Sequence, residues 1–386
     1  MKIKREISSE FKNLVAAYPV VTITGPRQAG KTTLTRMEFP DYKYCNLENP
    51  EIRKFASDDP NAFFDEFGYP LIIDEVQRVP ELLSYIQTIV DEKQKKGMFI
   101  LTGSHQFDLN EAITQSLAGR TALLHLLPFS IKELNKAGIS LKRDEYIHKG
   151  FLPRIYKDDL EPTRAYRNYF QTYVERDMRQ LINLRNIAEF EIFLRLLAGR
   201  AGQLVNLSSL SNDIGISVTT LQGWLSILEA SFIVFKLYPY YENFGKRIIK
   251  SPKIYFTEIG LATYLLGIEN INQVSRDPLI GNLFENLVVI EAVKARLNKG
   301  LDPNMFFYRD NNKNEVDLIY KCANTLIPIE IKSAKTFNKV FFKGINYFKT
   351  ITSRASEGYL IYSGQFTPDI GSNKIRHFTD TYEIVE

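Results

Sequence analysis

The stretch Gly25-Pro26-Arg27-Gln28-Ala29-Gly30-Lys31-Thr32 decides the fold of the first part of this 386-residue chain. It follows the apolar run Val20-Val21-Thr22-Ile23-Thr24, which we predict to be a buried strand, and a helix is expected to begin at Lys31. A glycine-rich loop between a strand and a helix surrounds phosphates with backbone N–H donors at the positive end of the helix. The sequence therefore predicts a nucleoside triphosphate site at residues 25–32 and Thr33. A simple tight turn is the alternative, and the flanking strand and helix argue against it.

Two residues of this loop are expected to act on the phosphates. Lys31 would place its charge on the β- and γ-phosphates, and Thr32 would give its hydroxyl to Mg²⁺. The predicted ligands are therefore ATP and Mg²⁺, with ADP as the product.

Carboxylates follow a second apolar run, Leu71-Ile72-Ile73-Asp74-Glu75. Ligands collect at the C-terminal edge of a parallel sheet, so Asp74 would hold Mg²⁺ through water and Glu75 would orient or deprotonate the attacking water. A solvated turn is the alternative for such a pair. Ser104 follows another predicted strand, Phe99-Ile100-Leu101-Thr102, and is the candidate sensor of the γ-phosphate.

The whole first part alternates short β-branched runs with helix-like stretches. This alternation is typical of a parallel sheet covered by helices. The predicted strands are 20–24, 44–47, 71–74, 99–102 and 123–127.

On these motifs the chain resembles the AAA+ ATPases, and more closely a prokaryotic group with the strings GPRQAGKTT, IIDEVQ and LTGS. The resemblance extends through residues 116–120, 128–130 and 172–177 into a C-terminal domain of unknown function that accompanies these ATPases. It implies ATP hydrolysis and a possible homo-oligomer in which a neighbour's arginine completes the site. Arg120 and Arg176 are the candidates, and a surface salt bridge is the alternative for each.

A helix-turn-helix is predicted in the middle of the chain. Leu207–Ile214 is the expected first helix, Gly215 a turn, and Ser217 the N-cap of a second helix over Val218–Leu228. The runs 232–238 and 253–256 would add a β-hairpin and make a winged helix. Short side chains on the second helix could reach base edges, namely Thr219, Thr220 and Gln222.

Basic residues gather at the tip of the predicted hairpin. They are Lys246, Arg247, Lys250 and Lys253, with Tyr240, Tyr241 and Phe244 nearby. Such a cluster is typical of a wing that contacts DNA phosphates, although a solvated hairpin or a domain-packing surface is also open. The net charge of +4 gives no general sign of nucleic-acid binding, so the prediction rests on this local cluster.

Carboxylates and one lysine form an ordered set in the last domain: Glu285 on a helix, Asp317 on a strand, and Glu330-Ile331-Lys332 on the next strand. Neighbouring strands would bring Asp317 beside Glu330, and alternation puts Glu330 and Lys332 on one face. Asp317 and Glu330, with Glu285 nearby, offer a divalent metal its hard oxygen ligands. Lys332 would activate water or stabilise charge at a scissile phosphate.

This set resembles the PD-(D/E)xK nuclease fold, although Glu315-Val316 stands where a proline would precede Asp317. The resemblance implies metal-dependent DNA cleavage by Asp317, Glu330 and Lys332. A surface ion pair between Glu330 and Lys332, and a fold that binds DNA or protein without cutting, remain alternatives.

The predicted organisation is therefore an α/β multidomain protein. An AAA+ P-loop domain occupies residues 1–150, a helical connector 151–200, a winged helix 201–270 and a restriction-endonuclease-like domain 271–386.

The composition, 44% hydrophobic and 24% charged, is that of globular domains. Without a signal peptide or an apolar run of roughly 18 residues, a cytoplasmic protein with no membrane role is expected. Cys45 and Cys322 are expected to be unpaired core residues.

These predictions favour an ATPase whose nucleotide state controls DNA binding and a nuclease-like domain. One alternative is a regulatory switch whose C-terminal domain only binds a partner. Another is a small-molecule kinase, which would use the same loop but would transfer phosphate to a metabolite. The long downstream region carries no signature of a metabolite pocket, which argues against the kinase.

Overall fold

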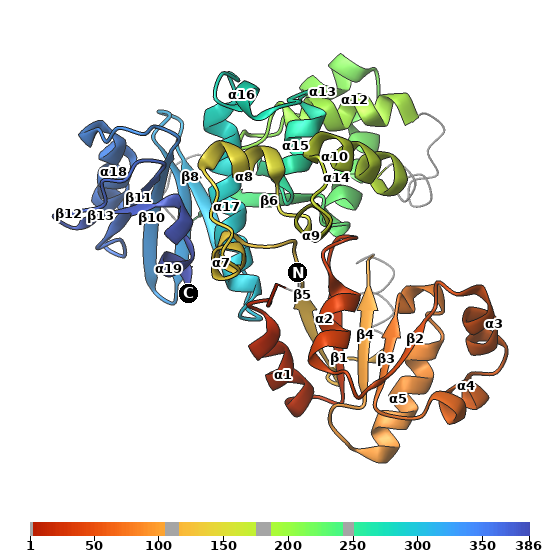
Figure 1. Ribbon diagram of the computed structural model, residues 1–386. Coiled ribbons are helices and arrows are strands. Elements are labelled where there is room, and N and C mark those ends of the chain that lie inside the picture. Colours follow the sequence, from red (N-terminus) through yellow and green to blue (C-terminus); the bar gives the residue numbers. More distant parts are fainter. Residues whose placement is uncertain (1–2, 105–115, 175–186, 242–250) are drawn as a thin grey trace. The chain divides into compact units, whose positions relative to one another are not determined.

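The computed structural model describes residues 3–104, 116–174, 187–241 and 251–386. The chain forms two compact units. The first contains residues 1–129 with the short segments 230–232 and 297–301, and the second contains the remainder. Each unit is described by itself below, and the helices and strands of both carry their labels in Figure 1.

The first unit is built on a five-stranded parallel sheet with the order β2-β3-β4-β1-β5. Its strands are β1 Val20–Thr24, β2 Lys43–Asn46, β3 Leu71–Asp74, β4 Phe99–Gly103 and β5 Thr121–His125. Its helices are α1 Ser8–Ala17, α2 Lys31–Glu38, α3 Pro50–Asp58, α4 Pro60–Phe67, η1 Val76–Arg78 and α5 Leu82–Lys93. The predicted parallel sheet is confirmed, with β5 beginning two residues earlier than expected.

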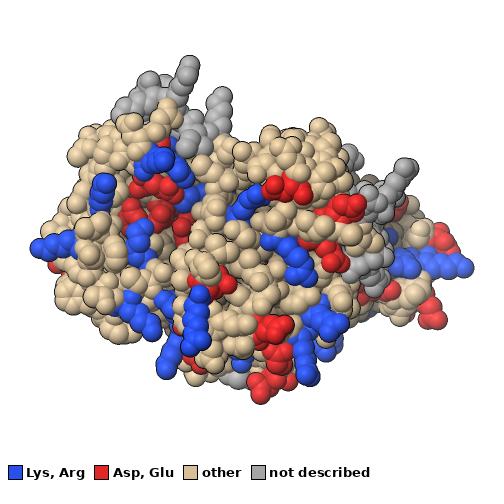
Figure 2. Space-filling model, turned by 90° about the horizontal axis from the view of Figure 1, so that it is seen from above, with Lys and Arg blue, Asp and Glu red and all other residues tan. Residues whose placement is uncertain are grey.

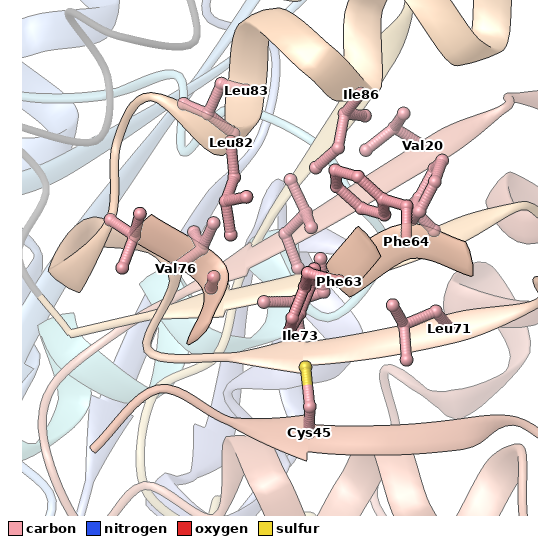
Figure 3. Close-up of a cluster of buried hydrophobic side chains, with 14 of the residues drawn as sticks. Val20, Cys45, Phe63, Phe64, Leu71, Ile73, Val76, Leu82, Leu83 and Ile86 are labelled. Carbon is pink, nitrogen blue, oxygen red and sulfur yellow. The ribbon is translucent and has the colours of Figure 1, made fainter. Parts of the chain in front are cut away.

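Two hydrophobic clusters cover the two faces of this sheet. Along β1, Val20 belongs to one cluster and Val21 to the other, as alternation along a strand requires. Figure 3 shows the first cluster, in which Phe63 and Phe64 of α4 and Leu83 and Ile86 of α5 pack against the strands. Helices α1 and α2 contribute Phe11 and Leu34 to the second cluster. The sheet is therefore buried on both faces, and the strand ends are left to form a site.

The second unit begins with helices and continues with a mixed sheet. Its helices are α7 Ile131–Lys136, α8 Arg143–Lys149, α9 Pro153–Lys157, α10 Pro162–Tyr169, η2 Phe170–Val174, α12 Ile187–Ala198, α13 Leu207–Ile214, α14 Val218–Ala230, α15 Ile259–Leu265, α16 Ile271–Val274, α17 Ile280–Leu297, η3 Lys339–Phe342, α18 Lys343–Ile351, η4 Phe378–Asp380 and α19 Tyr382–Val385. Its strands are β6 Val234–Pro239, β7 Lys253–Phe256, β8 Met305–Arg309, β9 Glu315–Cys322, β10 Thr325–Lys332, β11 Gly358–Tyr362, β12 Asp369–Ile370 and β13 Asn373–His377.

The helices of the predicted helix-turn-helix are α13 and α14. Gly215 ends α13 with a φ of +80°, which glycine adopts without strain, and the Ser217 hydroxyl accepts a hydrogen bond from Thr220 N at 3.1 Å to cap α14. Strands β6 and β7 pair antiparallel after these helices. These are the elements from which a winged helix was predicted.

Strand β6 also pairs parallel with β8, so the hairpin and the last domain share one eight-stranded sheet. The order is β12-β13-β11-β10-β9-β8-β6-β7. The sheet therefore crosses residue 270, where the sequence predicts a boundary between two domains.

The two cysteines are free. Cys45 is buried in the core of the first unit, as expected. Cys322 is exposed at the end of β9, so the expectation of a core residue was wrong there.

None of the helices in the described parts of the chain combines the length and the apolar character that a membrane span requires.

Candidate functional site

The loop between β1 and α2 has a backbone that depends on glycine. Gly25 has a φ of +150°, and a Cβ atom at this position would lie 2.1 Å from the carbonyl oxygen of Leu126. Gly30, directly before α2, has a φ of +94°. Since L side chains rarely adopt such conformations, both glycines are required for the path of the loop.

Lys31 is held inside this loop. Its ammonium donates to the carbonyl oxygens of Gly25 and Pro26, at 2.9 Å each, and the residue is 6% exposed. Burial lowers the pKa of Lys31 to about 8, against the opposing effect of the nearby Glu75 and Asp74 carboxylates. The loop thus surrounds a lysine whose charge is partly desolvated.

Asp74 at the end of β3 accepts hydrogen bonds from three hydroxyl groups. Thr32 Oγ1 lies 3.1 Å from Oδ1 and 2.9 Å from Oδ2, and Tyr44 OH lies 3.0 Å from Oδ2. Thr102 Oγ1 donates to Oδ1. Asp74 is buried, so these donors fix its carboxylate in place.

Glu75 follows in a left-handed conformation, with a φ of 57°. Its backbone N–H donates to Thr102 Oγ1 at 3.3 Å. Its Oε2 accepts from Ser104 Oγ at 3.0 Å and from Gln77 Nε2. Gln77 Nε2 also lies 3.3 Å from Ser104 Oγ, which joins the three side chains in one network.

The strand order explains why these residues meet. Strand β4 lies between β1 and β3, so Thr102 and Ser104 at its end lie between the loop and the acidic pair. The structure thus brings together Thr32 with Asp74 and Glu75 with Ser104, as the sequence predicts. The roles of these residues in binding and hydrolysis stay predictions.

Three polar residues of this site were missed from the sequence. Thr102 lies in the LTGS string that ends at Ser104, and Gln77 lies in the IIDEVQ string that contains Asp74 and Glu75. Their proximity to predicted site residues could have indicated that they belong to the site. Tyr44 lies on β2 and reaches Asp74 because β2 is the neighbour of β3. No feature of the sequence indicated this pairing.

Of the two arginines predicted to complete the site of a neighbouring subunit, the structure describes Arg120. Arg120 binds Asp91 through two bonds, Nε to Oδ1 at 2.6 Å and Nη2 to Oδ2 at 2.8 Å. This is the salt bridge that the sequence left open as the alternative. Arg176 lies outside the described residues.

The carboxylates of the C-terminal set meet around Lys332. Its ammonium lies 2.9 Å from Asp317 Oδ2 and 2.7 Å from Glu330 Oε2, and Ile331 N donates to Asp317 Oδ2 at 2.8 Å. Burial and the charge of Asp317 raise the pKa of Glu330 to about 9. Burial also acts to raise the pKa of Asp317, but the charges of Lys332 and Lys253 lower it to about 2. Of the two carboxyl groups, Glu330 is therefore the one that is protonated more easily.

Glu285, the helix member of this set, is bound by a second lysine. Lys253 Nζ lies 2.9 Å from Glu285 Oε1 and 2.7 Å from Glu315 Oε1, and Tyr255 OH donates to Glu285 Oε1 at 2.7 Å. Among the described residues, no three Asp, Glu, His or Cys side chains are grouped so that they could hold a metal ion. Metal binding by Glu285, Asp317 and Glu330 stays a prediction.

The predicted DNA contact at Lys253 requires a correction. Lys253 is 2% exposed, because its ammonium is enclosed between two carboxylates, and it is not available to a phosphate. Lys246, Arg247 and Lys250 lie outside the described residues. The side chains predicted to face base edges are exposed on α14, namely Thr219, Thr220 and Gln222.

Comparison with known families divides the chain into three parts. Residues 17–135 match the profile of the AAA domain. Residues 140–272 and 280–380 match two domains of unknown function, DUF8612 and DUF4143.

Several curated proteins are similar to most of the chain. Uncharacterized protein Rv2008c of Mycobacterium tuberculosis is 31% identical over 338 residues, which cover 86% of this chain and 74% of that protein. An uncharacterized protein of Methanocaldococcus jannaschii is 24% identical, with 93% of this chain and 83% of that protein covered. Among solved structures, the Walker-type ATPase of Pyrococcus abyssi is 17% identical over 67% of this chain and 94% of its own, with a TM-score of 0.44.

Proposed function

Because this chain belongs to the same family as the mycobacterial protein Rv2008c, and carries an AAA domain of the P-loop ATPase type, we propose that it hydrolyses ATP with Glu75 as the catalytic base. The observation that carries the proposal is the network that orients Glu75. Its carboxylate accepts from Ser104 at 3.0 Å and from Gln77, and it directly follows the Asp74 that the loop residue Thr32 binds.

The loop residues bind the triphosphate. Backbone N–H groups around Gly30 face the phosphates, and the Lys31 ammonium exchanges its bonds to two loop carbonyls for the β- and γ-phosphate oxygens. Ser104 contacts the γ-phosphate from the end of β4. Glu75 takes the proton of the attacking water on its carboxylate.

The residues beside the loop fit a magnesium ion. Thr32 Oγ1 and the Asp74 carboxylate are hard oxygen donors within 3.1 Å of each other, and the ligands of Mg²⁺ in proteins are of this kind. When bound, Mg²⁺ neutralises charge on the phosphate oxygens. Thr32 and Asp74 are the residues that would hold it.

We also propose that the nucleotide state controls a DNA-directed output in the second unit. Two observations favour DNA: exposed Thr219, Thr220 and Gln222 on α14 suit contacts to base edges, and Lys332 joins Asp317 and Glu330 in the strand order of a PD-(D/E)xK site. Figure 2 shows basic and acidic side chains interspersed over the described surface of one face.

The experiment that tests both proposals measures phosphate release by the full chain with Mg²⁺, with and without DNA. Hydrolysis that DNA stimulates several-fold is expected. Hydrolysis that duplex and single-stranded DNA leave unchanged would favour the regulatory switch, in which the C-terminal part binds another partner. Phosphate transfer to a metabolite instead of water would favour the kinase.

A further inference from the structure

A surface directly beyond the Glu330-Ile331-Lys332 strand end combines lysines with apolar and aromatic side chains. It is formed by the segment that leads through η3 into α18 and by the loop after β11. We call the side chains of these two segments the lysine–aromatic surface. They are Lys335, Phe337, Lys339, Val340 and Lys343 of the first segment and Phe366 of the second, whose ring pairs with that of Phe337.

The charge of this region is one-sided. Residues 333–356 contain five basic residues and no Asp or Glu. Two of the five, Lys349 and Arg354, bind neighbouring polar groups of the fold. Lys335, Lys339 and Lys343 are exposed, and no carboxylate in the described parts of the chain forms an ion pair with them. An anionic ligand would therefore meet three available ammonium groups.

The apolar side chains among these lysines are unusually exposed. Val340 is 68% exposed and Phe366 is 55% exposed. The ring of Phe366 lies 5.7 Å from that of Phe337, which packs in turn against the buried cluster around Phe342. The exposed ring of Phe366 is thus supported from below by Phe337 and the buried cluster.

The two segments that form the surface are bound to each other. Ser363 Oγ donates to the carbonyl oxygens of Ser333 and Ala334, at 2.8 and 3.1 Å. Tyr362 OH donates to Phe366 O at 2.6 Å and holds the loop that carries the exposed ring. The two segments are therefore held together before any ligand binds.

We propose that the lysine–aromatic surface binds single-stranded DNA. A single strand presents an anionic backbone together with unstacked bases, and the surface offers cations beside flat rings. Duplex DNA would satisfy the lysines but would hide its bases from Phe366. The segment that carries the lysines follows Lys332 in the sequence, and a Cβ atom at Gly344 would meet Glu330 Oε1, so a strand bound here would pass close to the C-terminal carboxylates. The choice of DNA as the nucleic acid rests on the proposed function.

The test is fluorescence anisotropy of the full chain with a labelled oligo-dT of about 20 nucleotides, titrated at several salt concentrations. Lys335→Ala/Lys339→Ala/Lys343→Ala should weaken binding and reduce the slope of log affinity against log salt by about 2, or ~0.7 for each phosphate contact. Phe366→Ala should weaken binding ~5- to 100-fold, and Phe366→Trp should restore it. All three variants should keep the ATPase rate measured without DNA and the melting temperature of the wild-type chain, which checks that they fold.

A matched control removes the same charge elsewhere. Lys93→Ala/Lys95→Ala/Lys96→Ala changes three exposed lysines of the first unit. It should leave the affinity within about twofold of wild type, because the proposal attributes binding to local contacts at the surface and not to the overall charge of the chain. Equal weakening by the two triple variants would overturn the proposal, as would wild-type affinity in Phe366→Ala. Tighter binding of oligo-U RNA, or of duplex DNA, would also overturn it.

The test separates this inference from the proposed function. A chain that binds no DNA of any kind would contradict both. A chain that binds single strands equally well with and without the three surface lysines would contradict the surface alone. Loss of duplex binding in Thr219→Ala/Thr220→Ala/Gln222→Ala, with unchanged single-strand binding, would support separate sites for the two forms of DNA.

Discussion

Thr32 Oγ1 lies 2.9 Å from Asp74 Oδ2 and thereby joins the first turn of α2 to the end of β3. The two residues are 42 positions apart in the sequence and meet because of the parallel order of β3, β4 and β1. The loop and the acidic strand end thus form one site, and the predictions that follow depend on this.

Glu75→Gln should bind ATP with nearly unchanged affinity and lose hydrolysis by at least ~100-fold, because the amide cannot take a proton from water. Binding is measured with a fluorescent nucleotide, and turnover by phosphate release. Lys31→Ala is the contrasting variant, and it should lose binding itself. Unchanged turnover in Glu75→Gln would remove Glu75 from the mechanism.

Gln77→Ala should lower kcat by ~10-fold with little change in KM, because it frees Glu75 Oε2 from one of its two side-chain donors without touching the loop. Ser104→Ala removes the other donor and, as the predicted sensor, should also raise KM. If Gln77→Ala alters KM and the melting temperature but not kcat, Gln77 serves the fold only.

ATP binding should weaken as the pH rises above about 8, the pKa to which burial lowers Lys31. Phosphate raises the pKa of the bound lysine, so above pH 8 the free protein must take up a proton on binding, and log Kd should rise by up to ~1 per pH unit. Calorimetry in buffers of different ionisation enthalpy measures this uptake. Lys31→Arg, which does not titrate in this range, should show none.

Gly25→Ala should abolish nucleotide binding and lower the melting temperature. The added methyl group would stand 2.1 Å from Leu126 O, and the positive φ adds backbone strain. Gly138→Ala is a suitable control, since Gly138 also has a positive φ but a methyl group added there would meet nothing within 4 Å. Nucleotide binding that survives in Gly25→Ala would show that the loop can shift.

Metal-dependent nicking of plasmid or single-stranded DNA should disappear in Asp317→Asn and Lys332→Ala if the C-terminal set is catalytic. Because burial and the charge of Asp317 raise the pKa of Glu330, protons compete with a metal ion for this carboxylate, and activity should increase with pH as Glu330 releases its proton to solvent. A chain that cuts nothing with Mg²⁺ or Mn²⁺, with or without ATP, would leave the domain a binding module.

The parts of the fold that could be predicted depend on short stretches of sequence. The apolar runs at 20–24 and 71–74 identify β1 and β3, and the glycines of the loop and the carboxylates after β3 identify the site. Lys253 could not be assigned in this way. Its charge indicated a surface contact, but its partners Glu285 and Glu315 come from distant elements, and burial between them is a property of the tertiary structure. The bond from Tyr44 to Asp74 and the pairing of β6 with β8 were unpredictable for the same reason.

The shared sheet limits how this protein can be divided. Expression of residues 271–386 alone would remove β6 and leave β8 as an open edge, without the pairing of Phe306 and Phe307 to Tyr238 and Pro239, and such edges promote aggregation. It would also remove Lys253 and leave Glu285 and Glu315 without their shared cation. The DUF4143 part therefore depends on the hairpin that precedes it, and a fragment meant to fold on its own must include β6 and β7.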